Sequence, residues 1–134
     1  MPNPETPERR PVVLVVDDDA MIRLLMRESL EQAGFEVIDA EDGAKALQRF
    51  AERLPEIVLM DVEMPKMDGF SACAALRRLP QGQDMPVILV TGHDDSETVN
   101  RAFDVGATDF LSKPINWPNL ACRVNYILRA CRTH

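Results

Sequence analysis

The sequence predicts an α/β fold in which a five-stranded parallel sheet carries helices on both faces. Three short apolar runs, at residues 12–16, 57–60 and 87–90, are rich in β-branched residues and show no polar alternation. Strands that are buried on both faces of a parallel sheet have this continuous pattern. Segments with apolar residues at helical spacing lie between the runs, and the connections are short. Strand and helix therefore alternate along the chain, which is typical of this fold class.

The first half of the chain is expected to contain two strand–helix units. Strand 12–16 leads into a helix that ends at Gly34, and a weaker strand at 35–39 leads into a helix that ends at Pro55. Glycine terminates helices in a left-handed conformation, and proline cannot continue one. We expect Asp19 to cap the first helix, which would begin near Ala20. The apolar stripes of the two helices are Ile22, Leu25, Met26, Leu30 and Ala33, followed by Ala44, Leu47, Phe50, Ala51 and Leu54.

The second half is expected to contain three further units. Strand 57–60 is followed by a helix and a polar loop at 80–86, and strand 87–90 by a short helix that Gly106 ends. A weaker strand at 108–111 precedes the last helix, which Trp117 and Pro118 open. The apolar stripes of these helices are Phe70, Cys73, Leu76 and Leu79; Val99, Ala102 and Phe103; and Leu120, Val124, Ile127, Leu128 and Cys131.

Length and composition exclude several classes of protein. The 134 residues suffice for one domain, and the net charge of -7 disfavours nucleic acid as a direct partner. The three cysteines form no C-x-x-C pair, and the two histidines complete no zinc pattern. No apolar run is long enough to cross a membrane, so we expect a cytoplasmic protein. Residues 1–11 are expected to form a loose leader, 12–132 the domain, and 133–134 a tail.

Candidate site residues, most of them polar, follow four of the five predicted strands at the point where each strand ends. In an open parallel sheet, ligands bind beyond the carboxyl ends of the strands, so these residues are expected to converge. They are Asp17, Asp18 and Asp19 after the first strand; Asp61 and then Glu63 after the third; Thr91, Gly92 and His93 after the fourth; and Lys113 and Pro114 after the fifth.

The residue types at these positions indicate a metal-assisted anion site. Carboxylates packed together repel one another and require a cation. Oxygen ligands without a thiolate or paired histidines favour a hard ion, Mg²⁺ or, as an alternative, Mn²⁺. A lysine and a hydroxyl beside that ion can hold a phosphoryl group.

Four stretches of the chain resemble the receiver domain of two-component response regulators, the CheY-like family. They are VVLVVDDD (12–19), IVLMDVEMPKMDG (57–69), VILVTGH (87–93) and DFLSKPI (109–115), and their order and spacing agree over residues 12–132. The resemblance implies a flavodoxin-like, doubly wound (βα)5 fold. It also implies a phosphorylation-switched regulatory domain that catalyses only its own phosphorylation and dephosphorylation, rather than an enzyme with an external product.

The resemblance assigns the metal ligands and the phosphoacceptor. Asp61 matches the residue that accepts a phosphoryl group from a phosphohistidine. Asp17 and Asp18 match the acidic pair that binds Mg²⁺, with Asp18 as the direct ligand and Asp17 acting through water. The backbone carbonyl of Glu63 matches a further ligand.

The remaining site residues are also implied by the resemblance. Thr91 matches the switch hydroxyl, Lys113 the lysine that pairs with the phosphoryl group, and Phe110 the aromatic switch position, where the family often has tyrosine. Pro114 follows the lysine, often through a cis bond, and Gly69 shapes the loop beside Asp61. The positions that tune phosphoryl lifetime are Glu63, Gly92 and His93.

Three rival functions are less well supported by the residues. An aspartate-nucleophile phosphatase of the haloacid dehalogenase type needs a cap for which the chain lacks room, and its motif fits poorly after the first strand. A flavodoxin-type nucleotide-binding module would need a glycine-rich phosphate loop, which the sequence lacks. A receiver that docks without phosphorylation would not need the complete site.

The partners implied by the resemblance are a histidine kinase or phosphotransfer protein and an output. The output would be an effector domain or a downstream protein that docks on the surface of the fourth helix, fifth strand and fifth helix, with a homodimer as one route. Residues 114–130 resemble the last helix of receivers that precede cyclic-di-GMP domains. The last helix has no glycine or proline stop, which suits a linker into a following domain. A stand-alone regulator is the alternative.

Overall fold

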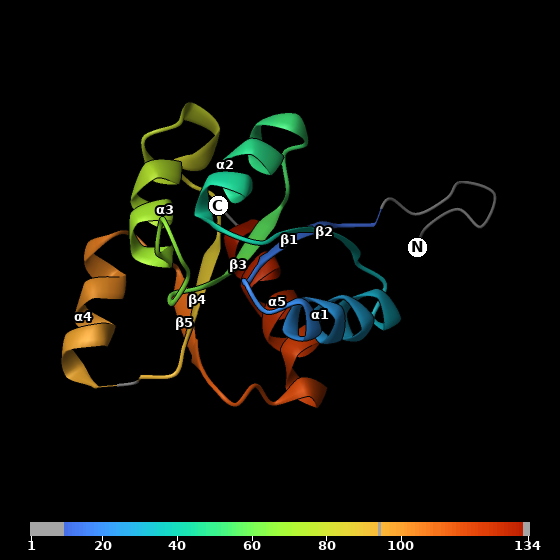
Figure 1. Cartoon of the computed structure of the whole chain (residues 1–134). Helices are drawn as coiled ribbons and strands as arrows, with labels where there is room; N and C mark the ends of the chain where they lie inside the picture. The colour runs from blue at the N-terminus through green and yellow to red at the C-terminus, as the bar shows by residue number, and fades with distance from the viewer. Residues whose placement is uncertain (1–9, 94, 133–134) are drawn as a thin grey trace.

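The computed structural model describes residues 10–93 and 95–132, which form one parallel sheet between two layers of helices (Figure 1). The strand order is β2-β1-β3-β4-β5, and every neighbouring pair is parallel. This order is that of the doubly wound, flavodoxin-like fold, so the fold class implied by the family resemblance is confirmed. The strands are β1 (Val12–Val16), β2 (Glu36–Ala40), β3 (Ile57–Asp61), β4 (Val87–Thr91) and β5 (Asp109–Ser112).

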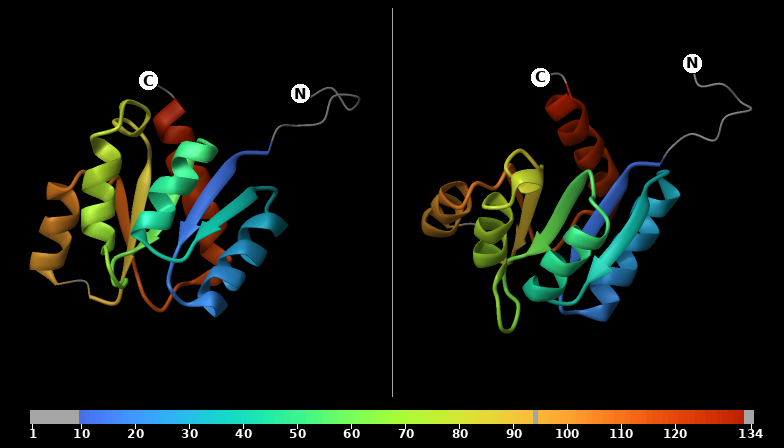
Figure 2. Two further views of the ribbon diagram at one scale, coloured as in Figure 1. Left: turned by 45° about the horizontal axis from the view of Figure 1, so that its top comes forward. Right: turned by 90° about the horizontal axis from the view of Figure 1, so that it is seen from above.

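Helices α1 and α5 cover one face of the sheet, and α2, α3 and α4 cover the other (Figure 2). Trp117 begins the last helix, as expected, and Asp19 caps the first by accepting from the amides of Met21 and Ile22. The helices are α1 (Ala20–Gln32), α2 (Gly43–Glu52), α3 (Gly69–Arg77), α4 (Ser96–Asp104) and α5 (Trp117–Arg132), with a 3₁₀ turn, η1 (Pro80–Gly82), before β4.

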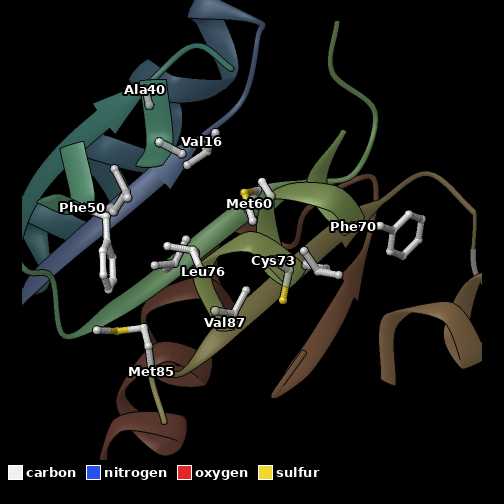
Figure 3. Close-up of a cluster of buried hydrophobic side chains, with 14 of the residues drawn as sticks. Val16, Ala40, Phe50, Met60, Phe70, Cys73, Leu76, Met85 and Val87 are labelled. Carbon is white, nitrogen blue, oxygen red and sulfur yellow. The ribbon is translucent and has the colours of Figure 1, made fainter. Parts of the chain in front are cut away.

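The three central strands supply both hydrophobic cores. All residues of β1, β3 and β4 are buried, and alternate side chains enter opposite layers. Val15 and Leu59 pack towards α1 and α5, whereas Val16 and Met60 pack towards α2 and α3 (Figure 3). Each fully buried aliphatic side chain stabilises the fold by roughly 1.5–3 kcal/mol. This double burial explains why the apolar runs show no alternation.

The strand predictions at the sheet margins are displaced by one residue. β2 begins at Glu36 rather than Phe35, because Phe35 is part of the capping turn that follows α1: its amide donates to the carbonyl of Leu30, while Gly34 adopts a φ of 95°. β5 likewise begins at Asp109 rather than Thr108.

Some expected core positions are wrong. Phe103 is 58% exposed because α4 buries only Ala102 against the sheet margin. Leu54 is 52% exposed because α2 ends at Glu52, before this residue. Ala33, Ala44 and Ala51 are also exposed, and the predicted polar loop at 80–86 contains the 3₁₀ turn. The predicted leader falls mostly on residues 1–9, and the tail on 133–134; both segments lie outside the described residues.

Candidate functional site

The loop that follows β1 and the last residue of β3 bring three carboxylates together at the carboxyl edge of the sheet. One carboxylate oxygen each from Asp17, Asp18 and Asp61 lies within 4.8 Å of the others. Asp17 and Asp61 are 0% and 2% exposed, whereas Asp18 is exposed. Two of the three negative charges are therefore buried, and the third lies at the mouth of the cluster.

Lys113, which follows β5, is the cation that approaches the two buried carboxylates. Its Nζ lies 3.1 Å from Asp61 Oδ1 and 3.6 Å from Asp17 Oδ2. The bond between Lys113 and Pro114 is cis, as the family resemblance implies. One lysine charge does not balance three carboxylates, so these four side chains together carry excess negative charge.

The same two oxygens lack a hydrogen bond. Among the described residues, Asp17 Oδ2 and Asp61 Oδ1 have no partner in hydrogen-bond geometry, and Lys113 approaches them as an ion pair only. Buried polar atoms are rarely left in this state, and such exceptions often mark functional sites. A ligand that supplies positive charge or hydrogen-bond donors would complete the cluster.

The electrostatics of the cluster also favour binding of a cation. Burial, followed by the charge of Asp17, raises the pKa of Asp61 to about 6, and burial also raises the pKa of Asp17. Burial opposes the charged form of Lys113, but the neighbouring carboxylates outweigh it and raise the lysine pKa. A divalent cation would remove the repulsion that raises the carboxyl pKa values, and the oxygen-only donor set fits Mg²⁺. The backbone N–H of Glu63, in the loop that follows, acts in the opposite direction and lowers the pKa of Asp61.

Thr91 lies at the end of β4 and is 1% exposed. Its Oγ1 accepts from the amide of His93 at 3.0 Å, and its carbonyl accepts from the amide of Lys113 at 2.7 Å. Phe110, on β5, is half-buried against the core under α2, α3 and α4. Both predicted switch residues thus lie on the neighbouring strands β4 and β5.

Gly69 starts α3 in direct contact with the loop after β3. A Cβ at this position would lie 2.3 Å from the Asp61 carbonyl oxygen, and the Gly69 amide donates to the carbonyl of Val62 at 2.9 Å. Only glycine permits this approach, which supports its predicted role in shaping the loop.

The three predicted tuning positions meet at the rim of the site. His93 Nε2 lies 3.7 Å from Glu63 Oε1, and both side chains are well exposed. A Cβ on Gly92 would lie 3.5 Å from the same Glu63 oxygen, an ordinary contact. The rim can therefore accept a larger residue at Gly92, unlike the loop at Gly69.

Sequence reasoning missed two features beside this site. Arg23 on α1 donates to the carbonyl of Asp17, a contact that no sequence pattern announces because the acceptor is backbone. A hollow of about 400 Å³ opens between the β4 loop and α4, where Arg101 stacks over the Phe70 ring at 4.4 Å. Pairing of an arginine with an aromatic ring across two helices likewise depends on the tertiary fold.

The model of the response regulator receiver domain matches residues 13–125 of the chain. The chain is 36% identical over 119 residues to the DNA-binding dual master transcriptional regulator RpaA of a Synechocystis species, covering 89% of the chain and 49% of the relative. It is 38% identical over 117 residues to the response regulator MprA of a Mycobacterium species (strain KMS), covering 87% and 50%. The chain thus spans about half the length of these curated relatives.

Solved structures of similar proteins have the same fold as this chain. The chemotaxis protein CheY4 of Vibrio cholerae superposes with a TM-score of 0.86 at 33% identity, covering 89% of this chain and 99% of that one. A CheY-like receiver domain protein from Methanospirillum hungatei gives 0.87 at 26% identity, covering 93% and 98%.

The names of the relatives bear on two expectations about output. The Synechocystis relative is named as DNA-binding, which conflicts with our expectation of no direct nucleic-acid partner if this chain is part of a longer protein of that kind. These two relatives are named as a regulator of transcription and a response regulator, and they lend no support to a cyclic-di-GMP output. Within residues 10–93 and 95–132, no helix is long and apolar enough to cross a membrane.

Proposed function

The chain belongs to the response regulator receiver family, and we propose that it accepts a phosphoryl group on Asp61 and converts this modification into a change of its surface. As a receiver it is a regulatory domain of a two-component system. The observation that carries the assignment of Asp61 is its burial, with an oxygen that lacks a hydrogen bond, between Asp17, Asp18 and Lys113.

The proposed reaction is transfer between two side chains. A carboxylate oxygen of Asp61 attacks the phosphorus of a phosphohistidine on a histidine kinase or phosphotransfer protein. A P–O bond forms, the P–N bond breaks, and the leaving imidazole keeps the electron pair and takes up a proton. Water later attacks phosphorus, the new P–O bond breaks, and Asp61 leaves as a carboxylate. The domain thus resets itself and releases only inorganic phosphate.

The chain's own residues lower the barrier mainly by electrostatics. Lys113 is already 3.1 Å from Asp61 Oδ1, so its ammonium group is placed to pair with the oxygens of the incoming phosphoryl group. The Thr91 hydroxyl would donate to the same oxygens. Asp17, Asp18, Asp61 and the Glu63 carbonyl would hold Mg²⁺, with Mn²⁺ as a substitute. When bound, the ion cancels the repulsion between the acceptor carboxylate and the phosphoryl group.

Conversion of this modification into a signal would use Thr91 and Phe110. Movement of Thr91 towards the phosphoryl group frees space that Phe110 fills, which changes the surface formed by α4, β5 and α5. Glu63, Gly92 and His93 at the rim would tune access of water and hence phosphoryl lifetime. Pro114 and Gly69 would fix the two loops that carry Lys113 and follow Asp61.

The output follows from how much of the relatives the chain spans. In a protein built like the transcriptional relatives, the half outside this chain would act on DNA, and the receiver at 12–132 would control it through docking or homodimerisation. A stand-alone regulator would pass the signal by docking alone. Both cases suit a cytoplasmic protein.

Intact-mass measurement with acetyl phosphate tests the acceptor and the metal together. We expect one phosphoryl group to be added in the presence of Mg²⁺, with loss of labelling in EDTA and in Asp61→Asn. Asp19→Asn is the matched control, because Asp19 only caps α1 and asparagine caps equally well. Equal labelling of Asp61→Asn, or labelling that EDTA leaves unchanged, would show that the proposal is wrong.

A further inference from the structure

Arg23 ties the loop that carries the acidic pair to the end of a neighbouring strand. It lies in the first turns of α1, and its side chain is only 19% exposed. Its Nη1 donates to the carbonyl of Asp17 at 2.7 Å, and its Nε lies 3.4 Å from Asp39 Oδ2 on β2. One guanidinium thus spans the loop after β1 and the edge strand of the sheet.

The hydrogen bond from Arg23 adds to two others that hold Asp17 in place. The Asp17 amide donates to the carbonyl of Ala40 at 3.2 Å, and its Oδ1 accepts from the amide of Asp19 at 2.9 Å. The carbonyl held by Arg23 belongs to the peptide that joins Asp17 to Asp18. Its orientation therefore determines where the backbone places Asp18, the exposed member of the acidic cluster.

We propose that Arg23 is a positioning residue for the divalent-cation site: it orients the peptide between Asp17 and Asp18 so that both carboxylates face Asp61. The proposal rests on the metal site of the proposed function and adds a residue outside that site. Partners that orient the ligands of a metal, without touching it, typically change metal affinity by about 10- to 100-fold when removed.

The charge of Arg23 and its proposed positioning role predict opposite effects of its removal on Mg²⁺ affinity. Arg23 is a cation close to a cation site, so Coulomb repulsion alone predicts that its removal tightens Mg²⁺ binding. Positioning predicts that its removal weakens binding, because the loop loses its preorganised geometry. The direction of the change therefore separates the two effects.

Arg27 provides a matched control, one turn further along α1. It donates to the carbonyl of Val37 at 2.9 Å and lies 3.7 Å from the same Asp39, and it also pairs with Glu31 at 3.2 Å. Its removal takes away the same charge and a similar tie between α1 and β2. These contacts, however, go to Glu31 and β2 rather than to the acidic pair.

The test is calorimetric Mg²⁺ affinity of the whole chain as parent, Arg23→Ala, Arg23→Lys, Arg27→Ala and Asp18→Asn, with unfolding in EDTA as a check on folding. We expect Arg23→Ala to weaken affinity by about tenfold. Arg27→Ala should bind as tightly as the parent or slightly tighter. Arg23→Lys should fall between, because lysine keeps the charge but lacks the fork that holds two acceptors. At saturating Mg²⁺, labelling of Arg23→Ala by acetyl phosphate should approach the parent rate.

Equal or tighter Mg²⁺ binding by Arg23→Ala would overturn the proposal, as would an equal loss in Arg27→Ala. If Arg23→Ala does not fold, Arg23→Lys decides: weaker binding supports positioning, and parent affinity overturns it. Failure of the metal site itself has a different pattern. In that case Asp18→Asn binds as well as the parent, or the parent binds no Mg²⁺, and both proposals fall.

Discussion

Each end of the sheet has a long cationic side chain that approaches several oxygens, but the two ends differ in how these oxygens are hydrogen-bonded. At the amino ends of the strands, Arg77 donates to the carbonyls of Gly82, Met85 and Gly106 at 2.6 to 3.0 Å. At the carboxyl ends, Lys113 faces two buried carboxylates at 3.1 and 3.6 Å, and the nearer oxygen of each, Asp61 Oδ1 and Asp17 Oδ2, lacks a hydrogen bond among the described residues.

The difference separates stability from function. Arg77 connects α3 to the loop before β4 and to the turn after α4 through charge-assisted hydrogen bonds to neutral carbonyl groups. The hydrogen bonds at that end are therefore made without a ligand. The Lys113 end keeps excess negative charge in a buried place, which costs stability until a cation binds. Changes at the two ends should therefore affect different measurements.

The largest effect is expected at the amino end. Arg77→Ala removes the donors to three carbonyls and should lower the free energy of unfolding by about 3 kcal/mol, with Mg²⁺ affinity unchanged. Chemical denaturation gives the first quantity and calorimetry the second. Arg78→Ala, an exposed neighbour, is the control and should stay within about 0.5 kcal/mol of the parent. A large loss of Mg²⁺ affinity in Arg77→Ala would break the separation between the two ends.

At the carboxyl end, the raised pKa of Asp61 should make the stability of the metal-free protein depend on pH. The pKa of Asp61 is raised from 3.8 to about 6, so the folded state holds its proton more tightly than the unfolded state. Protonation of Asp61 therefore contributes roughly 2 to 3 kcal/mol to the free energy of unfolding. This contribution is fully present below about pH 4 and is lost as the pH rises through about 6. Denaturation in EDTA at several pH values measures it. Asp61→Asn should flatten this part of the profile; an unchanged slope would show that another group is responsible.

Alanine substitutions of two glycines at the carboxyl end of the sheet should differ in their cost to stability. Gly69→Ala places a methyl group against the Asp61 carbonyl and should cost about 2 kcal/mol and disturb Mg²⁺ binding. Gly92→Ala meets only an ordinary contact at the rim and should change stability by less than about 0.5 kcal/mol. Denaturation and calorimetry of both variants test this, and equal costs would show that the loop after β3 is not the tighter of the two.

The sequence predicted much of the fold because its strongest pattern, the uninterrupted apolar strands, has one cause. Strands β1 and β3 are buried on both faces, with Val15 and Leu59 in one core and Val16 and Met60 in the other. This double burial produces a continuous apolar run whatever the order of the strands in the sheet. The positions of Asp17, Asp61, Thr91 and Lys113 followed from the rule that strand ends converge. Phe103 was misplaced because helical spacing does not reveal that α4 lies at the sheet margin.

Other features had no counterpart in the sequence. Arg23 and Arg77 bind backbone carbonyls, and any residue type offers a carbonyl. Lys66 adopts a φ of 69° in the loop after Asp61. A glycine or asparagine at this position would have indicated such a left-handed conformation, whereas a lysine does not. Such contacts and conformations are imposed by the tertiary fold, so residue type alone does not specify them.

The most direct test of the central claim is to locate the phosphoryl group on the chain. Protein treated with acetyl phosphate and Mg²⁺ can be trapped with borohydride, which reduces an acyl phosphate, and its peptides sequenced by mass spectrometry. The proposed function predicts a single reduced residue at Asp61, absent without Mg²⁺. Modification at Asp17 or Asp18 instead, or at Asp61 regardless of Mg²⁺, would contradict it.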